Sequence, residues 1–207
     1  MTTAITTIAK GERTRQQILD AAEQVFADLG FAEARMEDVA QVVGVRRPSL
    51  LYHFKNKQDL YDSVKAEIYE ALRGAMARQR PAGDDPQAQL LGLLDSWLDF
   101  MASRPTAARI ILRNTIEKRL PRDSDQPRFS EAVVADFERL VERGRASGQF
   151  SDDIETTQLL MLLGNGILNY VCSGQVIGGG RAFDPAAPAH LERYRRLLHK
   201  TTRALLS

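Results

Sequence analysis

The chain has 207 residues, 43% of them hydrophobic, and a formal net charge of only +1. This length and apolar content allow one large buried core or two small ones, and the average charge excludes a protein that coats polyanions over its whole surface. The single cysteine, Cys172, excludes an internal disulfide and fits a reducing compartment. The densest apolar run, at residues 159–164, is too short to cross a membrane. We therefore expect a soluble cytoplasmic protein without a membrane partner.

The N-terminal region predicts a polar tail followed by one amphipathic helix. The first thirteen residues, MTTAITTIAKGER, lack the continuous apolar segment of a signal peptide, and we interpret them as a loose tail. From Arg13 to Leu29, apolar side chains recur at the three- and four-residue spacing of a helix with one buried face. Gly30 follows at a position where a left-handed residue would end this helix.

Two short helices come next. Residues 36–43 carry their apolar side chains on one face, and Gly44 ends this second helix. A third helix begins near Pro48, which suits a first turn because the N–H that proline lacks would be unsatisfied there. Three helices within about 55 residues, with a glycine-marked turn between the last two, predict a helix-turn-helix.

The third helix has two unlike sides. At about 100° per residue, Leu50 and Phe54 lie about 40° apart, on the side that would hold the helix onto the core. The same count turns Pro48 and Tyr52 about 160° away from Leu50. With Ser49 beside them, these residues are expected to point outward.

Positive charge gathers at the two ends of this outward face. Between Gly44 and Lys57 the basic residues are Arg46, Arg47, Lys55 and Lys57, with no acidic residue, whereas basic and acidic residues balance from Gln58 to the end of the chain. Such cations can neutralise phosphates, an arginine near a helix start can pair with guanine O6 and N7, and hydroxyls can bond phosphates or base edges. A basic cluster beside an apolar helix is also an ordinary solvated surface, so this pattern alone leaves both interpretations open.

The stretch GFAEARMEDVAQVVGVRRPSLLYHFKNKQDL, residues 30–60, resembles the DNA-binding domain of the tetracycline-repressor (TetR) family of bacterial regulators. The order and spacing of its glycines and apolar residues match the family across all three helices, over about the first 60 residues of the chain. The resemblance implies a homodimer on double-stranded DNA. Each third helix would enter a major groove of a pseudo-palindromic operator, with half-sites about 34–36 Å apart or a multiple of that.

The positions that the resemblance aligns with common DNA contacts are Arg46, Arg47, Pro48, Ser49, His53 and Lys57. The family often has a tyrosine where this chain has Leu51, and we expect the neighbouring Tyr52 to make that phosphate contact. It also tends to begin the second helix with Ser or Thr, where this chain has Arg35, which we add as a phosphate-binding cation. For His53, a half-buried ring bonded to the backbone is an equally good interpretation.

Beyond Lys57 the sequence predicts further helices and no strands. They are expected at residues 58–79, 87–103, 105–119, 129–146, 155–173 and 189–206. The run PAGDDP at 81–86 ends the first of them, and Asp152 three residues before Glu155 resembles a capping box. The glycine-rich run at 178–188 is expected to be a flexible connection. We predict an all-α protein with a DNA-binding domain at 1–57 and a helical ligand-binding and dimerisation domain at 58–207.

The predicted helix at 155–173 is apolar on almost every side, so more than one of its faces must be covered. With the last helix it is expected to form a four-helix packing across a two-fold axis. The residues expected in this dimer interface are Leu159, Leu163, Leu191, Tyr194 and Leu198.

Polar residues among apolar neighbours in the same domain predict a small-molecule site. The residues expected to line it are Trp97, Phe100, Met101, Arg109, Asn114, Asn165 and Asn169. The aromatic and methionine side chains fit an ordinary core as well, and the arginine fits a solvated face. Cys172 fits packing better than a redox switch. His190 and His199 have no partner cluster, so neither a metal nor a cofactor is expected.

Two classes of function remain open. The first is a ligand-responsive transcriptional regulator, expected to be a repressor, that binds a palindromic operator as a homodimer and is released by a small apolar or amphipathic effector. The second is an all-α enzyme or small-molecule-binding protein whose basic N-terminal surface is incidental. The sequence offers this second class no catalytic constellation, metal set or cofactor motif.

Overall fold

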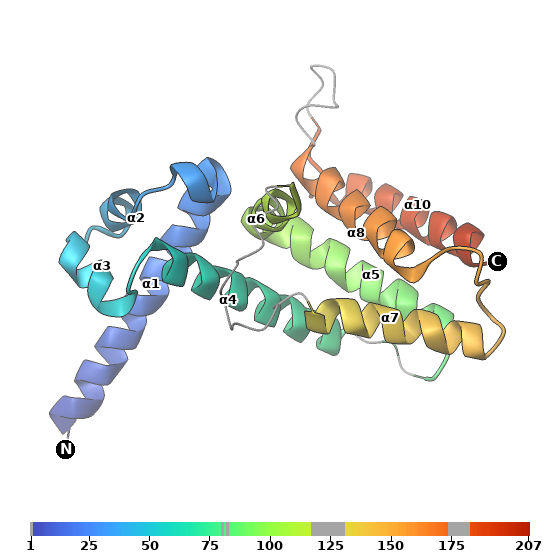
Figure 1. Cartoon of the computed structure of the whole chain (residues 1–207), viewed down its shortest axis with the longest axis horizontal. Helices are drawn as coiled ribbons and strands as arrows, with labels where there is room; N and C mark the ends of the chain where they lie inside the picture. The colour runs from blue at the N-terminus through green and yellow to red at the C-terminus, as the bar shows by residue number, and fades with distance from the viewer. Residues whose placement is uncertain (1, 80, 82, 117–130, 174–182) are drawn as a thin grey trace. The chain divides into compact units, whose positions relative to one another are not determined.

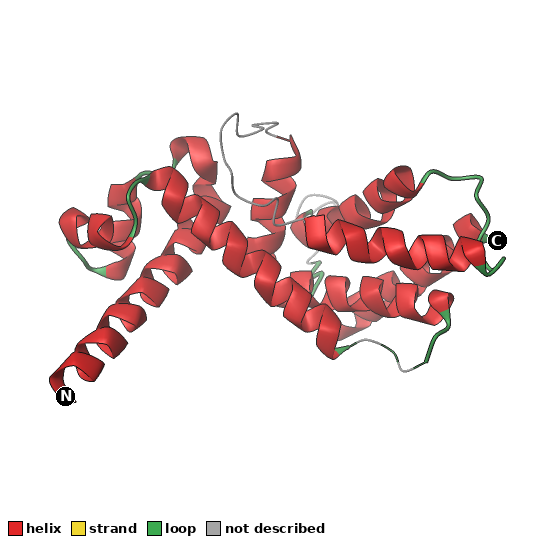
Figure 2. Ribbon diagram, turned by 60° about the horizontal axis from the view of Figure 1, so that its bottom comes forward, coloured by secondary structure: helices red, strands yellow, loops and turns green. Residues whose placement is uncertain are grey.

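The computed structural model describes residues 2–79, 81, 83–116, 131–173 and 183–207, and all regular structure in these residues is helical (Figure 1; Figure 2). The helices are α1 (Thr2–Glu33), α2 (Met36–Val43), α3 (Arg47–His53), α4 (Lys57–Arg78), α5 (Pro86–Ser103), α6 (Pro105–Ile116), α7 (Glu131–Ala146), α8 (Thr156–Cys172) and α10 (Pro188–Leu206). The predicted all-α fold is confirmed. The predicted helical residues 117–119 and 129–130, and the glycine-rich connection up to residue 182, lie outside the described residues.

The contacts divide the chain into two compact units, Met1–Ile68 and Tyr69–Ser207, and the division falls within α4. The boundary predicted between residues 57 and 58 lies at the start of this helix. It remains a prediction of where the DNA-binding and ligand-binding functions separate. No helix in the described part of the chain is long and apolar enough to cross a membrane.

The N-terminal unit is built on the apolar face of α1. Ile18, Ala22 and Phe26 of that face are buried, whereas Leu29 is 45% exposed. The Phe26 ring meets Tyr61 of α4 edge-on, with centroids 4.8 Å apart. Because α1 packs on α2, and α2 on α3, this core also fixes the orientation of the short third helix.

Both ends of α1 differ from the sequence-based expectation. The helix begins at Thr2, so the predicted loose tail is helical, and no proline interrupts it. Gly30 has φ 77° and ψ 169°, which a glycine adopts readily but which is not the left-handed helical conformation predicted there. A further helical turn follows it, because the Phe31 ring packs against Phe26 and Tyr61, at 6.3 and 4.9 Å between centroids.

The C-terminal unit surrounds α5, which packs against α6, α7, α8 and α10 (Figure 1). Leu90, Leu94 and Leu98 on this helix are completely buried. The helix starts cleanly because the Asp85 carboxylate accepts hydrogen bonds from the backbone N–H groups of Gln87 and Ala88.

The connection between α7 and α8 does not contain the capping box predicted for Asp152 and Glu155. Asp152 lies outside the helix, and Glu155 is itself the N-cap residue, without a side-chain cap. The Arg145 guanidinium holds this connection instead. It donates to the Thr156 hydroxyl at 2.8 Å and to the backbone carbonyls of Ser151 and Ile154. Three anchored positions fix the backbone here, so the helix start needs no capping box.

Candidate nucleic-acid interface and effector cavity

The turn between α2 and α3 depends on Gly44. This residue has φ 76° and ψ 28°, the left-handed conformation that glycine adopts without a steric penalty. Its N–H donates to the Gln41 carbonyl and the N–H of Val45 donates to the Ala40 carbonyl, which closes the end of α2. The short turn therefore directs the chain at once into α3.

The structure confirms the two predicted sides of α3. Leu50 is completely buried and Phe54 is 1% exposed, and the Arg15 guanidinium of α1 lies 5.0 Å above the Phe54 ring. The outward residues are exposed, and Tyr52 reaches 86%. Six of the eight positions predicted to contact DNA are exposed: Arg35, Arg46, Arg47, Pro48, Ser49 and Tyr52. This group presents three hydrogen-bonding or cationic side-chain types to solvent, those of arginine, serine and tyrosine.

The start of α2 is better capped than the sequence suggested. Arg35 occupies the N-cap position, where its own side chain cannot accept a hydrogen bond. The Asp38 carboxylate instead accepts a 2.8 Å hydrogen bond from the Arg35 N–H, which is one half of a capping box. The Arg35 side chain is therefore not needed for capping and remains exposed.

Glu37 of α2 pairs with Arg47 of α3, with 3.0 Å between Oε1 and Nε. Both side chains are more than half exposed, so the pair contributes little to stability. Sequence reasoning missed Glu37, because no residue spacing indicates which residues of two helices joined by a turn will face each other.

Two predicted DNA contacts have other neighbours in the structure. The Lys57 ammonium donates to the carbonyls of Phe31, Ala32 and Ala34, at 2.7, 3.2 and 2.9 Å, and lies 4.6 Å above the Phe31 ring. All three of its N–H donors are thus used at the end of α1. His53 is half-buried, and its ring meets the Tyr52 ring edge-on at 5.2 Å between centroids. Their phosphate contacts remain predictions.

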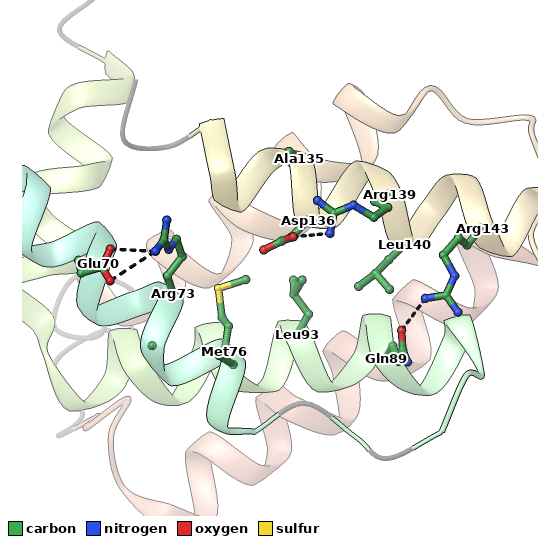
Figure 3. A pocket seen from close by; sticks show the side chains of 12 residues that line it. Glu70, Arg73, Met76, Gln89, Leu93, Ala135, Asp136, Arg139, Leu140 and Arg143 are labelled. Atoms are coloured by element: carbon green, nitrogen blue, oxygen red, sulfur yellow. Dashed lines mark hydrogen bonds and ion pairs between the residues drawn. The ribbon is translucent and has the colours of Figure 1, made fainter. Parts of the chain in front are cut away.

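A cavity of about 570 Å³ lies within the C-terminal unit, between the end of α4, α5 and α7 (Figure 3). Met76, Leu93 and Leu140 give it an apolar floor, one residue from each helix (Figure 3). Its volume falls within the range of about 300–1,000 Å³ that is usual for small-molecule sites.

Charged groups surround this floor. Arg73 pairs with Glu70 at 3.1 Å, Arg139 pairs with Asp136 at 2.7 Å, and Arg143 donates to the Gln89 amide oxygen at 2.9 Å (Figure 3). The lining residues carry three guanidinium groups and two carboxylates, and Arg143 also pairs with the Asp84 carboxylate beside the cavity at 3.8 Å. Each of the two ion pairs lies within one helix, at three-residue spacing. In a sequence this spacing is typical of a solvent-exposed helix face, so it did not indicate a cavity.

Comparisons with known proteins identify the family. The sequence model described as "Bacterial regulatory proteins, tetR family" matches residues 18–64, and "Tetracyclin repressor-like, C-terminal domain" matches residues 86–201, more than half of the chain. The chain belongs to the TetR family. The resemblance seen in residues 30–60 is therefore confirmed, and it extends over the C-terminal unit.

One relative is the HTH-type transcriptional repressor NicS of Pseudomonas putida strain KT2440, which is 30% identical over 156 residues, 74% of each chain. Two solved structures share the fold. The fatty acid degradation regulator FadR of Bacillus halodurans has a TM-score of 0.70 at 19% identity, covering 93% of this chain and 94% of that one. FadR of Bacillus subtilis, solved in complex with stearoyl-CoA, has a TM-score of 0.66 at 15% identity, covering 93% and 99%.

This TetR-family chain is thus a helix-turn-helix DNA-binding transcriptional regulator with a ligand-binding C-terminal domain. The family consists of regulators and not of enzymes, so the first of the two function classes holds at this level. Among the described residues, no group of three or more His, Cys, Asp and Glu side chains could hold a metal ion.

The seven residues predicted to line the effector site of this TetR-family chain are not among those that line the cavity. Trp97 and Met101 are buried, Asn169 is exposed, and Phe100, Arg109, Asn114 and Asn165 are half-buried. The Trp97 ring lies against Gly164 of α8, where a Cβ would come within 2.8 Å of it. Among the described residues, no hydrogen-bond partner reaches its buried Nε1. Trp97 and Met101 are therefore part of the core between α5 and its neighbours.

Three of the five predicted dimer contacts are wrong. Leu159, Leu163 and Leu198 are 0%, 3% and 5% exposed within a single chain, so they have almost no surface to offer a second copy. They fill the core because α8 packs on α5, α6 and α7, and α10 packs on α5. Leu191 and Tyr194 are half-buried. The exposed large apolar side chains of these two helices are Met161, Leu162 and Leu197.

Aromatic rings join α8 to α10. The Tyr170 and Tyr194 rings stack with centroids 3.9 Å apart, and burial raises the pKa of Tyr194 to about 12. At the end of α8, burial raises the pKa of the Cys172 thiol, and the positive charge of Arg109 opposes that rise. A raised pKa disfavours the reactive thiolate, which agrees with a packing role for this cysteine.

Proposed function

We propose that the protein is a repressor that binds a pseudo-palindromic operator as a homodimer and leaves it when an anionic, amphipathic effector occupies the cavity between α4, α5 and α7. The observation that carries the DNA-binding half is the exposed face of α3, held by two buried anchors and bordered by exposed arginines. A repressor of this kind works in the cytoplasm of a bacterium, where its operator DNA lies.

The residues of this face divide into two roles. Arg47 and Ser49 face outward at the start of α3 and are proposed to read base edges, with Pro48 against a thymine methyl group. Arg35, Arg46 and Tyr52 are proposed to bond phosphates and fix the register, with His53 and Lys57 beside them. Phosphate contacts carry no sequence information, so their loss should weaken binding to every DNA alike.

A gel shift on the DNA upstream of the protein's own gene, repeated at several salt concentrations, tests this division. Arg47→Ala should relax specificity at particular base pairs, at a cost of about 1–3 kcal/mol for a bidentate contact. Arg35→Ala should weaken all sequences equally and lower the salt slope by about one. A wild-type protein that binds this DNA no better than a scrambled duplex would contradict the proposal.

The cavity supports an effector with an apolar part and a negative charge. Its floor is apolar and its lining carries three arginines and two carboxylates, and the Asp84 carboxylate that also pairs with Arg143 is fully exposed. The likeness to a FadR structure that holds stearoyl-CoA, an anionic amphiphile, supports the same chemistry. Glu70, Arg73 and Met76 of the lining belong to α4, the helix that also contributes buried Leu60 and Val64 to the N-terminal unit. A ligand that displaces α4 at the cavity would therefore act on a helix shared with the DNA-binding unit.

Titration with long-chain acyl-CoA, free fatty acid and free CoA distinguishes the contribution of the apolar part of the proposed effector from that of its charged part. The fluorescence of Trp97, the single tryptophan, reports binding, and loss of the gel shift reports release. We expect the acyl-CoA to act at the lowest concentration and Arg143→Ala to weaken its binding, with Arg203→Ala at an exposed position of α10 as the control. Equal insensitivity to all three compounds would reject an anionic amphiphile as effector.

The dimer is proposed to form through the exposed sides of α8 and α10. The two helices lie side by side, joined by the Tyr170–Tyr194 stack (Figure 1). Met161, Leu162 and Leu197 are each more than half exposed, which is unusual for large apolar side chains on neighbouring helices. A second copy of the same face would cover them in a four-helix packing.

A further inference from the structure

The ion pair between Glu37 and Arg47 joins the first turn of α2 to the first residue of α3. Its side chains are 55% and 61% exposed, so water and salt reduce its contribution to stability to a small amount. A negative charge on a face that binds DNA also repels phosphates. A glutamate in this position therefore weakens general DNA affinity and gains little stability, which raises the question of what it does.

The atoms of the pair suggest an answer. Glu37 Oε1 contacts Nε of Arg47, the nitrogen on the side of the guanidinium, at 3.0 Å. Within the described part of the chain, no other side chain or carbonyl holds this guanidinium, so its two terminal amino groups stay available. A guanidinium that approaches a guanine end-on uses these two groups to bond O6 and N7 together.

Glu37 itself has a fixed position. It is the second residue of α2, whose start is held by the hydrogen bond from the Arg35 N–H to the Asp38 carboxylate. The first turn of a helix also favours a negative charge. The carboxylate that contacts Arg47 thus belongs to an ordered helix and not to a loop.

We propose that Glu37 is a positioning residue for Arg47: it holds the guanidinium from the side, so that its two terminal amino groups face a base edge. This inference rests on the proposed function, in which Arg47 reads a base. An exposed arginine that is already oriented loses less side-chain freedom on binding, and the gain applies only where a matching base accepts both bonds. Glu37 then increases discrimination between sequences while it decreases affinity for DNA in general.

Fluorescence anisotropy tests this with two labelled duplexes of equal length, an operator found by selection from random DNA and its scrambled form. The proteins are wild type, Glu37→Gln, Arg47→Ala and the double variant, with Glu33→Gln as the control because this exposed glutamate of α1 has the same charge. We expect Glu37→Gln to lower the ratio of operator to scrambled affinity about three- to fivefold, the size of an exposed ion pair. Glu33→Gln should leave the ratio unchanged.

Two further results should follow. In the Arg47→Ala background, Glu37→Gln should have no effect on the ratio, because the two residues act as one unit. Arg47→Ala should bind equally well to operators that differ at one particular base pair, and Glu37→Gln should lose discrimination at that same base pair. A loss of folding would not produce this agreement between the two variants.

Three outcomes would overturn the inference: an equal change of both affinities by Glu37→Gln, an undiminished effect of Glu37→Gln without Arg47, or an unchanged ratio in Glu37→Gln while Arg47→Ala lowers it. The first would make Glu37 a simple repeller of phosphates. Each of these is distinct from a failure of the proposed function, in which the wild-type protein itself would not discriminate between the two duplexes.

Discussion

The ammonium group of Lys57 closes the C-terminal end of α1. Three carbonyls that have no partner inside the helix accept its three hydrogen bonds, across 23 to 26 residues of sequence. A hydrogen bond from a charged donor contributes about 1.5–3 kcal/mol to stability. At a half-buried site such as this one, the contribution is smaller because water competes for the same groups. Lys57 therefore has a structural role in addition to the phosphate contact predicted for it.

Lys57→Ala should lower the free energy of unfolding by about 2 kcal/mol, because the carbonyls at the end of α1 lose their donor. Urea denaturation monitored by circular dichroism measures this. The matched control is Lys55→Ala, which removes the same charge from an exposed side chain and should change stability by less than about 0.5 kcal/mol. If the two variants unfolded at the same urea concentration, the structural role of Lys57 would be rejected.

Gly164 is the residue that lets Trp97 pack against α8. A Cβ at this position would lie 2.8 Å from the ring, too close for two carbon atoms, and both residues are buried. Gly164→Ala should therefore destabilise the protein by about 1–3 kcal/mol through overpacking and should shift the emission of Trp97.

The control for this substitution is Gly11→Ala in α1, where no atom lies within 4 Å of the added carbon. Alanine in a helix interior is favoured over glycine by about 0.5–1 kcal/mol, so this variant should be as stable as the wild type or more so. A Gly164→Ala protein that gained stability to the same extent would show that the Trp97 contact does not constrain the core.

At the scale of the helices, spacing in the sequence was sufficient wherever one side of a helix is buried. The count of about 100° per residue separated Leu50 from Tyr52 correctly, because α3 has a single packed side. It failed for Leu159, since α8 is covered by α5, α6 and α7, and an apolar side chain on such a helix is as often internal as external. The exposed Leu162 carries no mark in the sequence that distinguishes it.

Contacts between distant helices could not be predicted in the same way. The ends of Lys57 and Arg145 meet backbone carbonyls, and any residue has a carbonyl. The cavity joins side chains of α4, α5 and α7, among them Arg73, Leu93 and Leu140, whose proximity depends on how three helices cross. Helical periodicity describes the faces of one helix, whereas these features depend on the packing of several.

The stacked rings of α8 and α10 give the helix pair a defined response to alkaline pH. Burial raises the pKa of Tyr194 to about 12 and that of Tyr69 on α4 to about 12, above the ordinary value of 10.0. The folded protein thus holds these protons more tightly than the unfolded chain. The resulting stabilisation is complete below pH 10 and is lost as the pH rises from 10 to about 12.

Tyr194→Phe should reduce the fall in the urea midpoint between pH 10 and pH 12, and Tyr69→Phe combined with it should reduce the fall further. Tyr52→Phe, on the exposed face of α3, removes an exposed hydroxyl in place of a buried one and is the control. A pH dependence that Tyr194→Phe leaves as steep as in the wild type would mean that this hydroxyl is not protected by the fold.

For the whole molecule, binding to a two-fold operator requires two copies of the chain held at a fixed spacing. In the C-terminal unit, α8 and α10 carry the exposed apolar residues Met161, Leu162 and Leu197. Half-sites bound by unlinked monomers would each contribute only their own affinity, so loss of the dimer should reduce operator binding far more than any single DNA contact does.

Leu162→Glu should therefore convert the proposed dimer into folded monomers, because a charge in the middle of the proposed apolar interface must be desolvated without a partner. Sedimentation velocity over a range of protein concentrations measures the change, and circular dichroism verifies the fold. Gln149→Glu adds the same charge to the exposed connection between α7 and α8 and should leave the dimer intact. A Leu162→Glu protein that still sediments as a dimer would exclude this side of α8 from the interface. If Leu162→Glu lowered operator affinity but the protein remained a dimer, Leu162 would affect DNA binding in some way other than dimerisation.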